Sequence, residues 1–251
     1  MKRWIAGVLA CFSLAGAAPA EALTERTVVI DPKRVSPFNE GYFQGWGTSL
    51  CWWANRVGYS DTLAQLAAEA FCDLDQGLGL NILRYNIGGG DDPSHDHITR
   101  TDSNMPGYTV YNNGTVTYDW TADYNQRNVL QRCVKAAGDD AIVEMFSNSP
   151  PYYMCKSGCS TGNTDAGTNN LRDDSYTAFA EYLAEVCKHY QDAWGIKVQS
   201  VEAMNEPYTN YWGAYSYKQE GCHFDLGDSE SKIITELQKA MAARGMSDVI
   251  L

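Results

Sequence analysis

The stretch "VEAMNEPYTNYWG" at residues 201–213 places an acid where a buried strand ends. Residues 201–204 are mostly apolar, the tripeptide Asn-Glu-Pro at 205–207 breaks that pattern, and an aromatic run follows. A carboxylate in this position is either an exposed surface residue without a role or the catalytic acid of a pocket. Because Asn-Glu-Pro alone is a modest signal, the elements around it must decide between the two.

Strand-like and helix-like segments alternate along the chain around this stretch. The loops after the strands are long, the returns from each helix to the next strand are short, and we read no hairpin signal between them. This order predicts parallel βα units. Apolar spacing predicts strands at 43–47, 81–87, 141–146 and 198–204, with helices near 60–75, from about 120 to Gly138, over 176–190 and over 233–241.

Long loops at one end of parallel strands favour a (β/α)8 barrel, whose active site gathers at the C-terminal strand ends. A doubly wound open sheet is the rival, but no phosphate-binding glycine fingerprint follows the first strand. Four strand–helix units are complete and "DVIL" at 248–251 opens a fifth strand, whereas a closed barrel needs eight. We therefore expect an α/β fold in which residues 41–251 form an incomplete (β/α)8 TIM barrel, truncated at about strand 5.

The composition restricts the class of partner. Hydrophobic content of 44% and charged content of 20% are typical of a globular protein. The formal net charge of −12 argues against nucleic acid, because phosphate binding draws on clustered Lys and Arg. It also suits neither an anionic membrane nor a polyanionic substrate. We expect a neutral oligosaccharide or polysaccharide partner, no cofactor, and a monomer.

The N-terminus has the pattern of an export signal. Lys2 and Arg3 precede an apolar stretch, residues 5–14, that is too short to span a bilayer. Small-residue cleavage sites follow at 18–20 and 20–22. We predict a signal peptide at residues 1–22 and a secreted or extracytoplasmic protein that does not stay in the membrane.

The chain contains eight cysteines, and export permits disulfides. Cys155 and Cys159, in a loop rich in Gly and Ser, are the candidate disulfide pair. Cys72, Cys133 and Cys187 fall on apolar faces of predicted helices, where a buried thiol is the ordinary interpretation.

Polar and aromatic residues follow all four predicted strands. Aromatic faces stack on sugar rings, while amides and acids bond to hydroxyl groups, so this mixture is typical of a carbohydrate cleft. The alternative, that the aromatic residues are simply core, holds less well for residues in loops. The predicted substrate-binding residues are Trp52 and Trp53 after the first strand, Arg84, Asn86, Asp91 and Asp92 after the second, Asn148, Ser149 and Tyr152 after the third, and Asn205, Tyr208 and Trp212 after the fourth.

Glu206 is the candidate catalytic acid. A general acid in glycoside cleavage is a carboxyl group held protonated near neutral pH, which a sheltered apolar site can supply. Glu144 and Glu202 are weaker candidates because they lie within strands and can be paired. His95 and His97 could be read as metal ligands, but no third ligand lies near them in the sequence, so we predict no metal.

Four stretches resemble glycoside hydrolase family 30, most closely its endo-β-1,6-galactanase-like branch. They are "GWGTSLCWWA" (45–54), "LGLNILRYNIGGGDDP" (78–93), "FSNSPPYYMCKSG" (146–158) and "VEAMNEP" (201–207). The resemblance implies a (β/α)8 barrel with a side β-structure, to which a strand within residues 23–40 ("TVVID", 27–31) contributes. It also implies retaining hydrolysis with Glu206 as acid/base, Asn205 beside it, and Arg84 near the nucleophile.

The family places its nucleophilic Glu after the seventh strand, which implies a position beyond residue 251. Because a retaining mechanism needs two carboxyl groups roughly 5–5.5 Å apart, we expect this chain alone to be inactive. Two other readings stay open. One is a non-catalytic carbohydrate-binding barrel, and the other is an inverting enzyme that pairs Glu206 with Asp91. The substrate could also be β-1,6-glucan or xylan instead of β-1,6-galactan.

Overall fold

The computed structural model describes residues 27, 29, 31 and 33–251. It contains two compact units, Met1–Gln44 and Gly45–Leu251, which are treated separately. In the described part of the first unit, a short 3-10 helix, η1, spans Phe38–Gly41. The predicted signal peptide lies outside the described residues, and so do residues 28 and 30 of the predicted strand at 27–31. Both therefore stay predictions.

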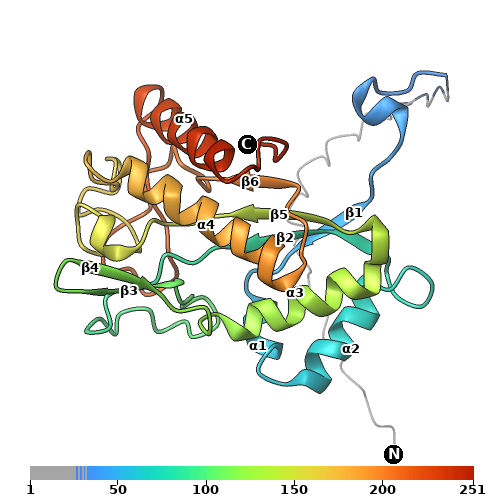
Figure 1. Cartoon of the computed structure of the whole chain (residues 1–251), viewed down its shortest axis with the longest axis horizontal. Coiled ribbons are helices and arrows are strands. Elements are labelled where there is room, and N and C mark those ends of the chain that lie inside the picture. Colours follow the sequence, from blue (N-terminus) through green and yellow to red (C-terminus); the bar gives the residue numbers. More distant parts are fainter. Residues whose placement is uncertain (1–26, 28, 30, 32) are drawn as a thin grey trace, which may run out of the picture. The chain divides into compact units, whose positions relative to one another are not determined.

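The second unit is built on a four-stranded parallel sheet in the order β1-β2-β5-β6 (Figure 1). Its strands are β1 (Trp46–Ser49), β2 (Leu80–Asn86), β5 (Ile142–Phe146) and β6 (Ser200–Glu202). The parallel pairs are β1 with β2, β2 with β5, and β5 with β6. This is the neighbour order of a (β/α) barrel, so the predicted fold class is confirmed.

The last residues continue the sheet beyond β6. Ile250 forms a parallel bridge with Ser200. The amide of Val201 donates to the carbonyl of Ile250 at 2.9 Å, and the amide of Ile250 donates to the carbonyl of Gln199 at 3.1 Å. The predicted opening of a fifth strand at 248–251 is therefore confirmed.

Helices connect the strands as the sequence predicts. The hydroxyl oxygen of Ser60 accepts from the amide of Leu63 and caps α2, while Gly138 ends α3 with a φ of 62°. In the described part of the chain, no helix combines the length and the apolar character needed to cross a membrane. The helices are α1 (Trp53–Val57), α2 (Asp61–Cys72), α3 (Tyr124–Ala137), α4 (Tyr176–Trp194) and α5 (Asp228–Ala243), with short 3-10 turns η2 (Gly138–Asp140) and η3 (Tyr152–Met154).

Alternating side chains give the sheet two different faces. Leu83, Tyr85, Val143 and Met145 are buried in the main hydrophobic core together with residues of α3 and α4. Figure 1 shows α3 and α4 crossing this face of the sheet. The alternate residues of β2, β5 and β6, which include Arg84, lie on the opposite face, as in a barrel whose interior is lined by every second side chain.

The loop between β2 and α3 contains a hairpin that the sequence analysis did not predict. Strands β3 (Thr109–Asn112) and β4 (Thr115–Tyr118) pair antiparallel. Asn113 and Gly114 join them with φ angles of 47° and 88°. Positive φ at both central residues is the type I′ turn that Asn-Gly favours. The expectation that no hairpin interrupts the βα units was therefore wrong.

The predicted disulfide between Cys155 and Cys159 is not formed. All seven cysteines in the described residues carry free thiols. The sulfur of Cys155 points back to the carbonyl oxygens of Pro150 and Pro151, each at 3.6 Å, while the sulfur of Cys159 contacts Thr161 and His97. Closeness in sequence did not bring the two thiols together because the loop turns them toward different neighbours. The predicted burial of Cys72, Cys133 and Cys187 is confirmed.

Candidate active site

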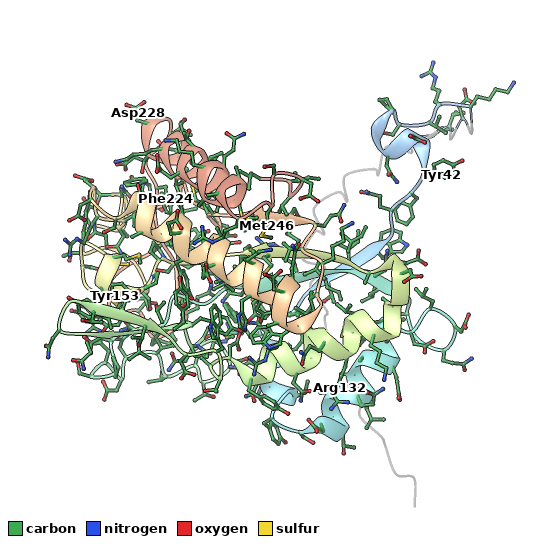
Figure 2. The ribbon with its side chains drawn as sticks, viewed as in Figure 1. Tyr42, Arg132, Tyr153, Phe224, Asp228 and Met246 are labelled. Carbon is green, nitrogen blue, oxygen red and sulfur yellow. The ribbon has the colours of Figure 1, made fainter. Side chains whose placement is uncertain are left out.

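The long loops that follow the strands gather at one end of the sheet, at the left of Figure 1. Figure 2 labels Tyr153 and Phe224, which come from the loops after β5 and β6 and lie toward this same end. The carboxyl ends of parallel strands meet at one edge, so side chains far apart in sequence are collected there. This end is the candidate active site.

Glu206 sits on a tight turn directly after β6. Its φ of 48° lies in the left-handed region, which a non-glycine residue adopts only when its surroundings hold it there. Two side chains fix its carbonyl oxygen, the indole nitrogen of Trp212 and the hydroxyl of Thr209, each at 3.2 Å. The side chain of Glu206 is exposed, and Tyr211 donates its hydroxyl to Oε2 at 2.9 Å. A positioned carboxyl group is therefore open to a substrate.

Arg84 connects β2 to the residue beside Glu206. Its Nη2 donates to Oδ1 of Asn205 at 3.2 Å and also to the carboxylate of Glu202, while Nε donates to Glu144 at 2.8 Å. The guanidinium carbon lies 3.4 Å from the centre of the Phe146 ring. The guanidinium group of Arg84 thus links three neighbouring strands, β2, β5 and β6. Glu144 and Glu202 are paired with this cation, and Arg84 and Asn205 are brought together as expected.

A cavity of about 550 Å³ lies between the loop after β2 and the start of the β3–β4 hairpin. Asp91, Asp92 and Tyr152, three of the predicted substrate-binding residues, contribute to its lining. Ser94 donates both its amide and its hydroxyl to Asp92, and these bonds lower the pKa of that carboxyl. Asp92 therefore faces the cavity as an ionised acceptor that suits a sugar hydroxyl.

Three other predicted substrate-binding residues are buried and bonded to the protein itself. Asn148 donates to Oδ1 of Asn86 at 3.2 Å, and Ser149 donates to the carbonyl of Pro150 at 2.9 Å. Asn86, Asn148 and Ser149 are at most 3% exposed. Their assignment as substrate contacts is corrected: the side chains of these strand-end residues support the loops from below.

The predicted aromatic residues also fall into two groups, those packed within the protein and those exposed to solvent. Trp53 donates its indole N–H to the carbonyl of Ser49 at 2.8 Å and packs edge-on against Phe71, so it belongs to the packing between loop and helix. Trp212 is buried and holds the turn of Glu206. Trp52 is half-buried, and Tyr208 is 65% exposed beside a cavity of about 380 Å³. The last two keep a face available for a sugar ring.

Glu220, an acid of the loop after β6 that the sequence analysis did not single out, is buried in the interior. Its Oε1 accepts from the amides of Gly89 at 2.8 Å and Gly90 at 3.0 Å, and its Oε2 accepts from Asn86 at 3.3 Å. Burial raises the pKa of this carboxyl to about 8, against the opposing effect of its donors. His223, from the same loop, is buried as well. Glu220 therefore braces the glycine loop after β2.

Asp91 is brought together with His95, His97 and Cys159. The sequence showed only two histidines separated by one residue, because Cys159 lies 68 residues from Asp91 along the chain. The sequence argument against a metal, that no third ligand cluster is in view, does not hold, because the fold brings Asp91 and Cys159 to the two histidines. Asp91 also accepts from the amides of Asp92 and Ser160.

The profile of O-glycosyl hydrolase family 30 matches residues 27–250. The chain belongs to glycoside hydrolase family 30. It is 36% identical over 248 residues to an endo-β-1,6-galactanase of Hypocrea rufa, with 91% of this chain and 49% of the relative covered. It is 28% identical over 293 residues to an exo-β-1,6-galactobiohydrolase of Bifidobacterium longum subsp. longum, with 93% and 19% covered. The resemblance inferred from the four sequence stretches is thereby confirmed.

Solved structures agree with this family 30 fold. A conserved exported protein from Bacteroides fragilis superposes with a TM-score of 0.71 at 21% sequence identity, over 82% of this chain and 42% of that one. The chain spans about half the length of the galactanase and about a fifth of the length of the galactobiohydrolase.

Proposed function

We propose that this chain carries the acid/base half of a secreted, retaining family 30 endo-β-1,6-galactanase. Two relatives support β-1,6-galactan as the substrate, because both are named for activity on β-1,6-linked galactose. Secretion is supported by the charged, apolar and small-residue order of residues 1–22.

The observation that carries the proposal is the arrangement of Glu206. Its backbone is held by Thr209 and Trp212, its carboxyl group is exposed, and Arg84 fixes the amide of Asn205 beside it. An acid held in one geometry next to a hydroxyl-binding amide can protonate the leaving oxygen of a glycosidic bond and later activate water.

We propose that the nucleophile comes from a segment outside these 251 residues. The neighbouring carboxylates of the described part are engaged elsewhere: Glu144 and Glu202 bind Arg84, and Glu220 binds backbone amides. A family 30 relative twice as long leaves room for a second carboxylate.

The inverting alternative is less well supported because it needs Asp91 as a base that activates water. The side chain of Asp91 is only 8% exposed, and both of its oxygens contact histidine nitrogens. A non-catalytic binding barrel remains the second candidate, because the cavity beside Asp92 and Tyr152 could hold a sugar without cleaving it.

The test uses the longest continuous reading frame that contains this chain. We expect it to hydrolyse β-1,6-galactan in preference to β-1,6-glucan or xylan, with the β-anomer as first product. Glu206→Gln should lower kcat/KM by roughly 10²–10⁴-fold, because the general acid is lost. Glu69→Gln, an exposed glutamate of α2, is the matched control and should leave kcat/KM unchanged. Normal turnover of Glu206→Gln would refute the assignment, and saccharide binding without hydrolysis would favour the binding barrel.

A further inference from the structure

Four side chains with metal-binding atoms converge beside the candidate active site. They are Asp91, His95 and His97 from the loop after β2, and Cys159 from the loop after β5. One ligand atom from each lies within 4.8 Å of every other. Ligand atoms around a tetrahedral zinc ion lie about 3.3–3.8 Å apart, given bond lengths of about 2.0–2.3 Å. The cluster is therefore close to the size of such a site.

The individual contacts are short, and the cluster is sheltered from water. Nε2 of His97 lies 2.6 Å from Oδ2 of Asp91 and 3.4 Å from the sulfur of Cys159. Nδ1 of His95 lies 3.3 Å from Oδ1 of Asp91. Cys159 is fully buried, and the side chains of Asp91, His97 and His95 are 8%, 13% and 20% exposed.

A second layer of contacts orients these ligands. Nδ1 of His97 lies 2.8 Å from the carbonyl oxygen of Ser216, an acceptor, so Nδ1 carries a proton and Nε2 is the nitrogen turned toward Asp91 and Cys159. The amide of Tyr215 donates to the sulfur of Cys159 at 3.3 Å, as amides do to thiolates. The amide of Ser160 donates to Oδ1 of Asp91 at 3.2 Å. Nitrogen, oxygen and sulfur atoms are therefore turned toward a common centre, where a metal ion would replace the protons that they now share.

We propose that Asp91, His95, His97 and Cys159 bind one Zn²⁺ ion. Thiolate and imidazole ligands favour zinc over Ca²⁺ or Mg²⁺, which prefer oxygen ligands only. Four protein ligands fill a tetrahedral shell and leave no position for water, which is the arrangement of a structural site. This proposal concerns binding alone and does not depend on the proposed galactanase activity.

The ion would join the three loops that carry the candidate active site. Its ligands come from the loops after β2 and β5, and its outer contacts, Tyr215 and Ser216, come from the loop after β6, which also carries Glu206. Asp92, which lines the cavity of about 550 Å³, is the residue directly after the ligand Asp91. Zinc would therefore hold the walls of the cleft in register at the strand ends.

Metal content and cobalt substitution test the site directly. The 251-residue chain, produced with zinc in the medium and passed through a desalting column, should retain about one zinc per chain by mass spectrometry. After removal of zinc by a chelator, Co²⁺ should give the visible bands of a tetrahedral ion together with a thiolate-to-cobalt charge-transfer band. Zinc should raise the melting temperature of the metal-free chain, and Mg²⁺ should not.

Matched cysteine variants locate the ion. Cys159→Ser should abolish the charge-transfer band and weaken zinc binding by more than the roughly 10–100-fold that loss of an outer contact costs. Cys155→Ser, a buried thiol of the same loop outside the cluster, should keep both signals. Substoichiometric metal in the wild-type chain, or no cobalt band and no zinc-dependent melting shift, would overturn the proposal. Equal zinc binding in both variants would also overturn it, because the ion would then lie elsewhere.

Discussion

Two glutamates of the same loop, Glu206 and Glu220, have opposite surroundings. Glu206 is exposed and accepts one side-chain hydrogen bond, from Tyr211. Glu220 is 1% exposed and accepts three bonds, from Asn86 and the amides of Gly89 and Gly90. The difference separates two roles of a carboxyl group at a strand end: one side chain is left available to a substrate, and the other holds the loop that shapes the site.

The comparison also shows why a perturbed pKa does not identify the catalytic acid here. Glu220 has the pKa expected of a general acid at neutral pH, about 8, because it is buried. Its oxygens are already occupied by protein donors, so no substrate can reach them. Glu206 is favoured as the acid because of its place after β6 and the exposure of its carboxyl group, and not because of a shifted pKa.

The largest expected effect on stability comes from Glu220→Ala. The change leaves the amides of Gly89 and Gly90 and the side chain of Asn86 without their shared acceptor in a buried place. Each unpaired donor costs about 1–3 kcal/mol, and partial relaxation should leave a loss of about 3 kcal/mol in the free energy of unfolding. Urea unfolding measures it. Glu69→Ala, on the exposed face of α2, is the control and should stay within about 0.5 kcal/mol of the parent; a loss below about 1 kcal/mol for Glu220→Ala would contradict the bracing role.

The pH dependence of stability should follow the same carboxyl group. Burial raises the pKa of Glu220 from 4.5 to about 8, and that of Asp123 from 3.8 to about 7. At a pH between the unfolded and the folded pKa of each group, the folded chain keeps a proton on that carboxyl group, whereas the unfolded chain has released it. The free energy of unfolding should therefore fall as the pH rises from 5 to 8, by roughly 6 kcal/mol for the two groups together, of which Glu220 contributes somewhat more than half.

Glu220→Gln isolates its share of this dependence, because glutamine does not ionise. Urea unfolding at pH 5 and pH 8 should show a smaller difference for Glu220→Gln than for the parent, with most of the gap at pH 8. Glu69→Gln should keep the parent's difference. An unchanged difference in Glu220→Gln would show that the buried carboxyl does not titrate in this range.

The smallest effect is expected for a change beside Glu206, the exposed member of the two glutamates. Tyr211→Phe removes the one side-chain donor to Glu206 but leaves the turn held by Thr209 and Trp212. Stability should change by less than about 0.5 kcal/mol, because Tyr211 is 56% exposed. The rate constant kcat should fall by a factor of about 3–10, since one hydrogen bond is worth about 1 kcal/mol. A matching loss of stability would mean that Tyr211 supports the fold.

Much of the fold could be predicted because its signals are local. Strands and helices repeat apolar residues at fixed spacing, and Gly138 marks the end of α3. The β3–β4 hairpin carried an equally local signal in Asn113 and Gly114, which the sequence analysis did not recognise as a turn. The Cys155–Cys159 pairing failed because spacing does not determine where two side chains of an irregular loop point.

The site was predictable where a residue follows its strand directly. Glu206, Asn205 and Arg84 meet as expected, because the ends of neighbouring parallel strands lie side by side. Asn86 was misassigned because its partner Glu220 lies 134 residues away in the sequence. The convergence of Cys159 on Asp91 was missed for the same reason. The sequence indicates which residues stand at the strand ends, and only the packing of the loops decides which of them face a substrate.

The most direct test of the central claim is the dependence of Glu206→Ala on the leaving group. In the longest reading frame containing this chain, cleavage of β-1,6-galactan should be lost, whereas an aryl β-1,6-galactobioside with an acidic phenol as leaving group should still form the glycosyl-enzyme, because it needs no protonation. Added azide should then raise turnover and yield the β-glycosyl azide, as expected when the acid/base alone is missing. Equal loss on both substrates without azide rescue, or undiminished galactan cleavage, would contradict the account.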